Sequence, residues 1–207
     1  MKSHFYAYIS KIRWLQRWGL KRNAVTENVM EHSWEVAAIS HALALIKNRY
    51  FGGSLDVNAI VVSAIYHDCS EVITGDMPSP IKYHSTEITT AYKSIERQAE
   101  RELLALLPDD LQRDYEAVIV EDKVPADHHR IIKSADTIAA YIKCQTEVAA
   151  GNKEFSKAAE KLKKRLDEID QDEVHFFLET FATSYTLTLD ELLQSPFTEN
   201  SRCEPLR

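Results

Sequence analysis

Four residues of this chain have the types and spacing of a metal site: His32, the adjacent pair His67 and Asp68, and Asp136. Two imidazoles and two carboxylates, with no thiolate, suit a borderline or hard divalent cation. A lone histidine on an apolar helix face is more often a hydrogen-bonded core residue than a ligand. Here, however, two inward histidines and two carboxylates all need partners, because isolated buried carboxylates are costly. One cation would satisfy all four, and the ligand set does not choose among Co²⁺, Mn²⁺, Mg²⁺, Zn²⁺ and Fe²⁺.

Helical periodicity predicts how these ligands are positioned. Asn28 followed by Glu31 is a helix start signal, and the apolar stripe behind it places His32 on the inward face. A second stripe predicts one helix over residues 57–73 that carries His67 and Glu71 on its inward side. Residues 127–150 are apolar on more than one face, which indicates a central helix with Asp136 in its middle.

The remaining segments predict further helices and one loop. The spacing favours a helix over residues 4–18 that ends at Gly19, and others over 86–107, from 108 toward 120, 154–169 and 174–193. Two prolines in residues 75–82 predict a short rigid loop after the His67–Asp68 segment. With only 5 Gly and 6 Pro, we expect an all-α bundle, with a single domain over residues 1–194 and a polar, flexible tail over 195–207.

Composition limits the partners and the compartment. A formal charge of −7 argues against general affinity for nucleic acid polymers. Cys69, Cys144 and Cys203 form no CxxC pair, which suits a reducing cytosol. No signal peptide or membrane span is recognised, so we expect a cytoplasmic protein without a membrane partner. A homodimer is expected only because dimers are the commonest assembly.

The chain resembles the HD-domain phosphohydrolase superfamily, whose pattern of His, His-Asp and a later Asp is met by the four candidate ligands. Within it, the chain closely resembles the bacterial 5′-deoxynucleotidases of YfbR type, up to about residue 151. The matching segments are RW at 17–18, ENVMEHS at 27–33, YHDCSE at 66–71, GDMPSPIK at 75–82 and KSAD at 133–136.

This resemblance implies a metal-dependent phosphomonoesterase that hydrolyses deoxyribonucleoside 5′-monophosphates and selects against ribonucleotides. It implies Glu71, Asp76 and Arg17 as catalytic residues. The substrate contacts it implies are Arg17, Trp18, His32, Asp68, Asp76, Met77, Pro78, Ser79 and Lys82.

Each of these roles has a chemical reason and an alternative. Arg17 and Lys82 would hold the phosphate, although a lone surface cation is more often merely solvated. Trp18 would exclude a ribose 2′-hydroxyl, or else it only covers the core. Glu71 would orient water or protonate the leaving oxygen, or else it orients His67. Asp76 would act on the sugar 3′-hydroxyl or on water, or else it only shapes the loop.

Other functions remain open at this point. The four ligands alone also fit an HD phosphohydrolase that acts on a cyclic nucleotide, a dNTP or a signalling nucleotide. A nucleotide-binding or metal-sensing module would keep the pocket without turnover. A structural bundle with a buried polar network predicts no stoichiometric metal.

Overall fold

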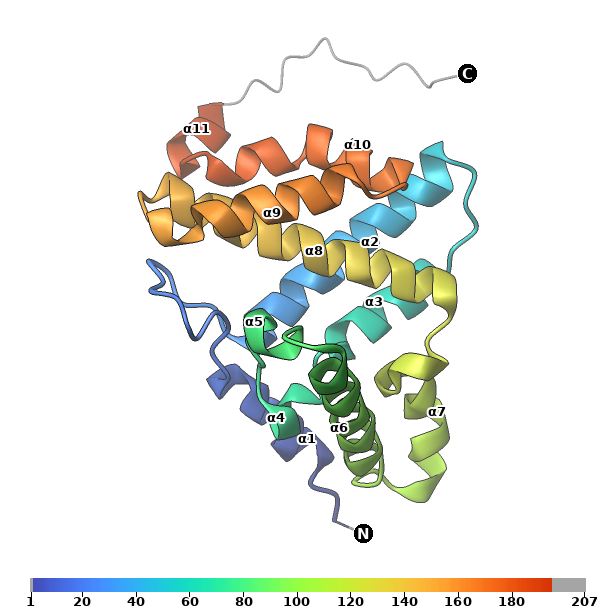
Figure 1. Ribbon diagram of the computed structural model, residues 1–207. Coiled ribbons are helices and arrows are strands. Elements are labelled where there is room, and N and C mark those ends of the chain that lie inside the picture. The colour runs from blue at the N-terminus through green and yellow to red at the C-terminus, as the bar shows by residue number, and fades with distance from the viewer. Residues whose placement is uncertain (1, 195–207) are drawn as a thin grey trace.

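The computed structural model describes residues 2–194, which form an all-α bundle (Figure 1). Over this range there is no β-strand, and one isolated antiparallel bridge joins Gln16 to Asn28. The predicted all-α class is therefore confirmed. No helix in the described range is long and apolar enough to cross a membrane. The predicted tail over residues 195–207, with Cys203, lies outside the described residues, and the division of the chain at residue 194 stays a prediction.

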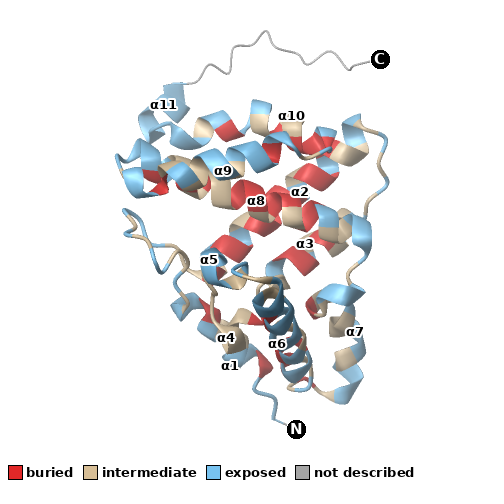
Figure 2. Ribbon diagram, in the orientation of Figure 1, coloured by how far each residue is buried: buried red, intermediate tan, exposed pale blue. Residues whose placement is uncertain are grey.

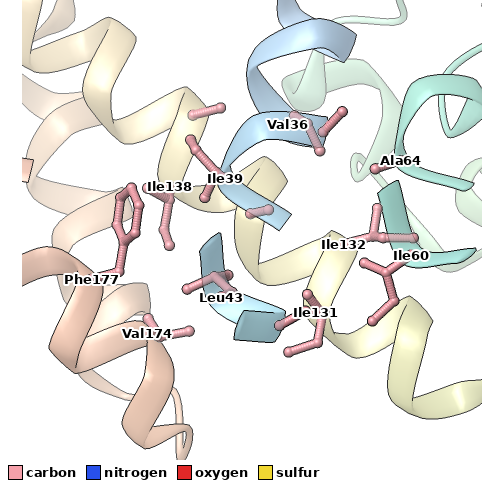
Figure 3. Packing of buried hydrophobic residues seen from close by; sticks show 14 of the residues in the cluster. Val36, Ile39, Leu43, Ile60, Ala64, Ile131, Ile132, Ile138, Val174 and Phe177 are labelled. Carbon is pink, nitrogen blue, oxygen red and sulfur yellow. The ribbon is translucent and has the colours of Figure 1, made fainter. Parts of the chain in front are cut away.

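The main core lies among α2 (Val29–Tyr50), α3 (Val57–Tyr66), α8 (Ala126–Ala149) and α10 (Asp172–Thr180). Buried residues concentrate on α2 and α8 (Figure 2). Figure 3 shows side chains from these four helices packed together, among them Val36, Leu43, Ile60, Ile138 and Phe177. The helix α9 (Ser156–Asp167) packs along α8, which is therefore central, as its apolar faces predict.

A second, smaller core holds the N-terminal part of the chain beside the region after α3. It contains Phe5 of α1 (Phe5–Ile9), Cys69, Leu103 of α6 (Thr86–Leu104), Leu107, and Ile119 of α7 (Asp109–Ile119). Two short helices, α4 (Glu71–Thr74) and α5 (Ser79–Lys82), both contact α6. The second core thus supports the segment that carries His67 and Asp68.

Capping fixes where α2 and α3 start. Asn28 accepts hydrogen bonds from the backbone N–H groups of Met30 and Glu31, and the Glu31 carboxylate accepts from the Asn28 N–H. This capping box confirms the predicted start and places His32 in the first turn of α2. Asp56 caps α3 by accepting from the Ala59 N–H.

Two predicted helices near the site are wrong in part. The first helix does not run to residue 18: α1 is followed by a 3-10 turn (Ser10–Trp14), after which the chain becomes extended. Backbone pairing explains the early end, because the Arg17 N–H donates to the Glu27 carbonyl and the Val29 N–H donates to the Leu15 carbonyl. The predicted helix over 57–73 is two helices, because α3 ends at Tyr66 and α4 begins at Glu71.

Two other predictions also needed correction. The predicted loop over 75–82 contains the short helix α5. Pro80 is compatible with this helix because it lies in the first turn, where a backbone N–H has no partner within the helix. The predicted last helix is divided into α10, a 3-10 turn (Ala182–Thr186) and α11 (Leu189–Gln194). A separate start signal causes this division, since Thr188 and Glu191 exchange hydrogen bonds at the start of α11. Further 3-10 turns are Glu121–Lys123 and Lys153–Phe155.

Candidate active site

Three of the four predicted metal ligands, His32, His67 and Asp68, come together between α2 and the end of α3, and the fourth, Asp136 of α8, lies beside His32. His32 is buried, and its Nε2 lies 3.0 Å from Asp136 Oδ1 and 3.7 Å from Asp68 Oδ2. His67 Nε2 lies 3.1 Å from the same Asp68 oxygen. One ligand atom each from His32, His67 and Asp68 lies within 4.8 Å of the others. Asp136 joins this group through His32, and its side chain remains 34% exposed.

The adjacent residues His67 and Asp68 share the site because the helix stops there. Consecutive residues on a helix diverge by about 100°. After Tyr66, however, the chain forms a turn in which the Cys69 N–H donates to the Tyr66 carbonyl and the Glu71 N–H donates to the Asp68 carbonyl. The turn at 67–70 therefore allows both side chains to point to one place.

Unsatisfied atoms in this cluster fit a cation. His67 Nδ1 lies 2.8 Å from the Ala64 carbonyl oxygen, to which it donates, so its Nε2 presents a lone pair. That Nε2 is buried and has no hydrogen-bond partner in the described part of the chain, although it faces a carboxylate oxygen of Asp68. Two facing acceptors need a proton or a metal between them. The residues present therefore fit a divalent cation with nitrogen and oxygen ligands.

The carboxylates of the cluster are held in their charged forms. Burial acts to raise the pKa of Asp136, but the hydrogen bond and charge of His32 outweigh it and lower that pKa to about 2. Burial likewise acts to raise the pKa of Asp68, and the neighbouring His67, His32 and Arg17 hold it well below its ordinary value. Both groups are thus deprotonated at neutral pH, as metal ligands must be.

Arg17 and Glu27 form an ion pair beside the candidate metal ligands. Arg17 Nε donates to Glu27 Oε1 at 2.8 Å, and Nη1 donates to Asp68 Oδ2 at 3.4 Å. Burial acts to lower the pKa of Arg17, but the surrounding carboxylates raise it above its ordinary value, so the guanidinium stays charged. Glu27 is absent from the predicted site. The signal that could have found it is its place at the start of the ENVMEHS segment, five residues before His32.

Glu71 is the first residue of α4, and its surroundings favour the protonated form of its carboxyl group. Its Oε2 is buried and has no hydrogen-bond partner among the residues that the structure describes. Burial, and then the charges of Asp68 and Asp76, raise the pKa of Glu71 to about 10. The alternative, in which Glu71 orients His67, is not what the structure shows, because His67 Nδ1 donates to the Ala64 carbonyl instead.

A pocket with a volume of about 160 Å³ adjoins this cluster. Residues 17–21 form one wall and residues 76–80 the other, so Arg17, Trp18, Asp76, Met77, Pro78 and Ser79 are brought together. Trp18 has φ 59°, a left-handed conformation that is costly for a residue with a side chain. Its ring packs edge to face on Phe155, with 5.3 Å between ring centroids.

Lys82 does not line this pocket. Its Nζ lies 2.8 Å from Glu96 Oε1 and 4.9 Å from the centroid of the Tyr92 ring. Its charge is therefore neutralised by a neighbouring helix, α6. A phosphate contact by Lys82 stays a prediction.

Solved structures share this fold. An HD-domain phosphohydrolase from Listeria innocua is 21% identical, with a TM-score of 0.78 and coverage of 88% of each chain. A cyanophage S-2L HD phosphohydrolase, solved bound to dA and one catalytic Zn²⁺ ion, is 22% identical, with a TM-score of 0.63. The match covers 86% of this chain and 96% of the phage protein. These likenesses place the chain in the HD-domain fold.

Sequence comparison is more specific. A 5′-deoxynucleotidase of Vibrio cholerae is 47% identical over 191 residues, which are 92% of this chain and 98% of that protein. A 5′-deoxynucleotidase of Photorhabdus laumondii is 45% identical over 190 residues, covering 92% of this chain and 96% of that protein. The family described as 5′-deoxynucleotidase YfbR-like matches residues 4–185. With its candidate metal cluster and pocket inside that range, the chain belongs to the YfbR-like 5′-deoxynucleotidase family.

Proposed function

We propose that this protein is a metal-dependent phosphomonoesterase that hydrolyses deoxyribonucleoside 5′-monophosphates to a deoxyribonucleoside and phosphate. One observation carries the proposal: Arg17 lines the pocket and also lies 3.4 Å from the ligand Asp68. A phosphate held by Arg17 would therefore lie beside the metal cluster, with the nucleoside in the pocket. The family membership of the chain supports the same reaction.

Different residues of the site would bind the metal, bind the phosphate and donate the proton. His32, His67, Asp68 and Asp136 would hold one divalent cation, whose chemistry when bound is to polarise a phosphoryl oxygen and to acidify the attacking water. Arg17 would bind the phosphate through the guanidinium nitrogens that Glu27 does not occupy. The Glu71 carboxyl, whose pKa is raised by burial and by the Asp68 and Asp76 charges, would donate its proton to the leaving 5′-oxygen.

Selection against ribonucleotides is the second part of the proposal. The pocket wall opposite the 76–80 segment contains Trp18, whose ring is fixed against Phe155. A 2′-hydroxyl pressed against this apolar ring would lose its hydrogen bonds to water without replacement. Asp76, on the other wall, would accept a hydrogen bond from the sugar 3′-hydroxyl.

Phosphate release from deoxynucleoside and ribonucleoside monophosphates, with Co²⁺, Mn²⁺ or Mg²⁺ added, tests both parts. We expect release only with metal, and faster release from the deoxy series. Asp136→Ala should abolish release and keep the helical content. Metal-dependent release from cyclic nucleotides or dNTPs instead would favour another HD phosphohydrolase. Tight binding without product would favour a nucleotide-binding module.

We further infer that the protein is a homodimer. A groove of about 560 Å³ runs between α2 and the segment after α10, and apolar residues such as Phe177, Phe181 and Leu192 line it. Trp34 and Leu189 are also exposed by 74% and 70%. A second copy would cover this surface in a symmetric interface. Sedimentation analysis should give twice the chain mass, and Phe181→Asp should shift it to a monomer. A cytoplasmic location and a lack of nucleic acid polymer partners complete the proposal.

A further inference from the structure

We propose that Glu27 is a positioning residue that couples the phosphate-binding Arg17 to the metal ligand His32. A single carboxylate oxygen, Glu27 Oε1, lies 2.8 Å from Arg17 Nε and 3.6 Å from His32 Nδ1. The side chains of Glu27 and Arg17 are each 13% exposed and that of His32 is 1% exposed. The inference rests on the proposed function, because it assigns Arg17 to the phosphate.

The first role of Glu27 concerns His32: its carboxylate favours the imidazole tautomer that carries the proton on Nδ1 and leaves Nε2 free to bind a metal. His32 Nε2 faces the oxygens of Asp136 and Asp68, so this nitrogen must present the lone pair to a cation. His32 Nδ1 is buried and has no hydrogen-bond partner within residues 2–194. A carboxylate beside Nδ1 favours the N–H on that nitrogen and makes Nε2 the better ligand. A decrease of a few tenths of an ångström in the distance between His32 Nδ1 and Glu27 Oε1 would bring the two atoms within hydrogen-bond range.

Toward Arg17, the same oxygen fixes the orientation of the guanidinium group. With Nε bound to Glu27, Nη1 is directed at Asp68. The backbone reinforces the pair, because the Arg17 N–H donates to the Glu27 carbonyl at 2.9 Å. Asn28, the next residue, is held by the capping box of α2. Glu27 is therefore held in place by the backbone, and its carboxylate can orient the side chains of both Arg17 and His32.

A purely structural role is the competing explanation, in which Glu27 only neutralises a buried arginine. That role predicts a loss of stability without a change in metal affinity. Glu27→Gln separates the two, because glutamine keeps the size and removes the charge. The matched control is Glu31→Gln on the next turn, since among the described residues the Glu31 carboxylate accepts a hydrogen bond only from the Asn28 N–H of the capping box.

The experiment titrates the metal-free full-length proteins with Co²⁺ and follows the visible absorption of the bound ion. Thermal unfolding is recorded without metal, and KM and kcat for a deoxynucleoside monophosphate are measured at saturating Co²⁺. For Glu27→Gln we expect the Co²⁺ Kd to rise about 10- to 100-fold, as is usual for partners of metal ligands. We also expect KM to rise by a larger factor than kcat falls. Glu31→Gln should keep the wild-type Kd and KM.

A wild-type Kd and KM in Glu27→Gln would overturn the proposal, and so would an equal loss in Glu31→Gln. If Glu27→Gln does not fold, Glu27→Asp is titrated instead. Its shorter side chain withdraws the oxygen from both partners, so an unchanged Kd would again overturn the proposal. Failure of the proposed function is distinguishable, because wild-type protein would then release no phosphate while the comparison of metal affinities still applies.

Discussion

Glu71→Gln should stabilise the metal-free protein at neutral pH while it removes activity. The pKa of Glu71 is raised from 4.5 to about 10 by burial and by the Asp68 and Asp76 carboxylates. A raised carboxyl pKa means that the unfolded chain loses its proton first, so the free energy of unfolding falls as pH rises from 4.5 toward 10. At pH 7 the accumulated loss is roughly 3 kcal/mol. Glutamine, which has the same shape and no charge, avoids this loss.

Denaturant unfolding in EDTA at pH 5 and pH 7 measures the effect, because chelation excludes the contribution of a bound cation. We expect Glu71→Gln to exceed the wild type by roughly 3 kcal/mol at pH 7 and by less than about 1 kcal/mol at pH 5. Turnover with metal should fall about 10²- to 10⁴-fold. Glu102→Gln, an exposed change on α6, should alter stability by less than about 0.5 kcal/mol at either pH. A Glu71→Gln protein less stable than the wild type at pH 7, or an equal difference at both pH values, would refute the reasoning.

Three further outcomes follow from the site. Asp68→Asn should leave no stoichiometric metal by elemental analysis, since it neutralises the ligand that both His32 and His67 approach. Trp18→Ala should lower the ratio of deoxy to ribo kcat/KM about 10- to 100-fold, measured on paired monophosphates. Glu147→Gln should cost about 2–3 kcal/mol in denaturant unfolding and raise KM, because the buried Glu147 carboxylate accepts from the Ala24 and Val25 N–H groups in the segment after the pocket wall.

The positions of residues within long regular helices could be predicted from the sequence. Asn28 and Glu31 specify the start of α2 through local hydrogen bonds, so the inward direction of His32 follows from spacing alone. The same holds for Asp136, because the apolar faces of α8 require a central position. Periodicity reports which face of a helix is buried, and both ligands lie within long helices.

Periodicity did not predict the places where the chain leaves a helix. The apolar pattern continues from Val57 through Glu71, and nothing in it marks the end of α3 at Tyr66. That end depends on the second core, in which Cys69 packs beside Phe5 and Leu103 from distant parts of the chain. Contacts of this kind are not encoded in a local window.

The departures from regular structure are also where the site is built. Trp18, which adopts a left-handed backbone, lies in one wall of the pocket, and Gly75, with φ 73°, directly precedes the other. The 67–70 turn lets adjacent residues serve one cation, which a continuous helix forbids by its 100° rotation per residue. The long helices α2 and α8 thus position the candidate ligands His32 and Asp136, and irregular segments held by the second core and by Glu27 position the site residues that converge from other directions. This division explains why the sequence alone predicted the four candidate ligands but not Glu27, whose place beside Arg17 depends on the pairing of residues 15–17 with residues 27–29.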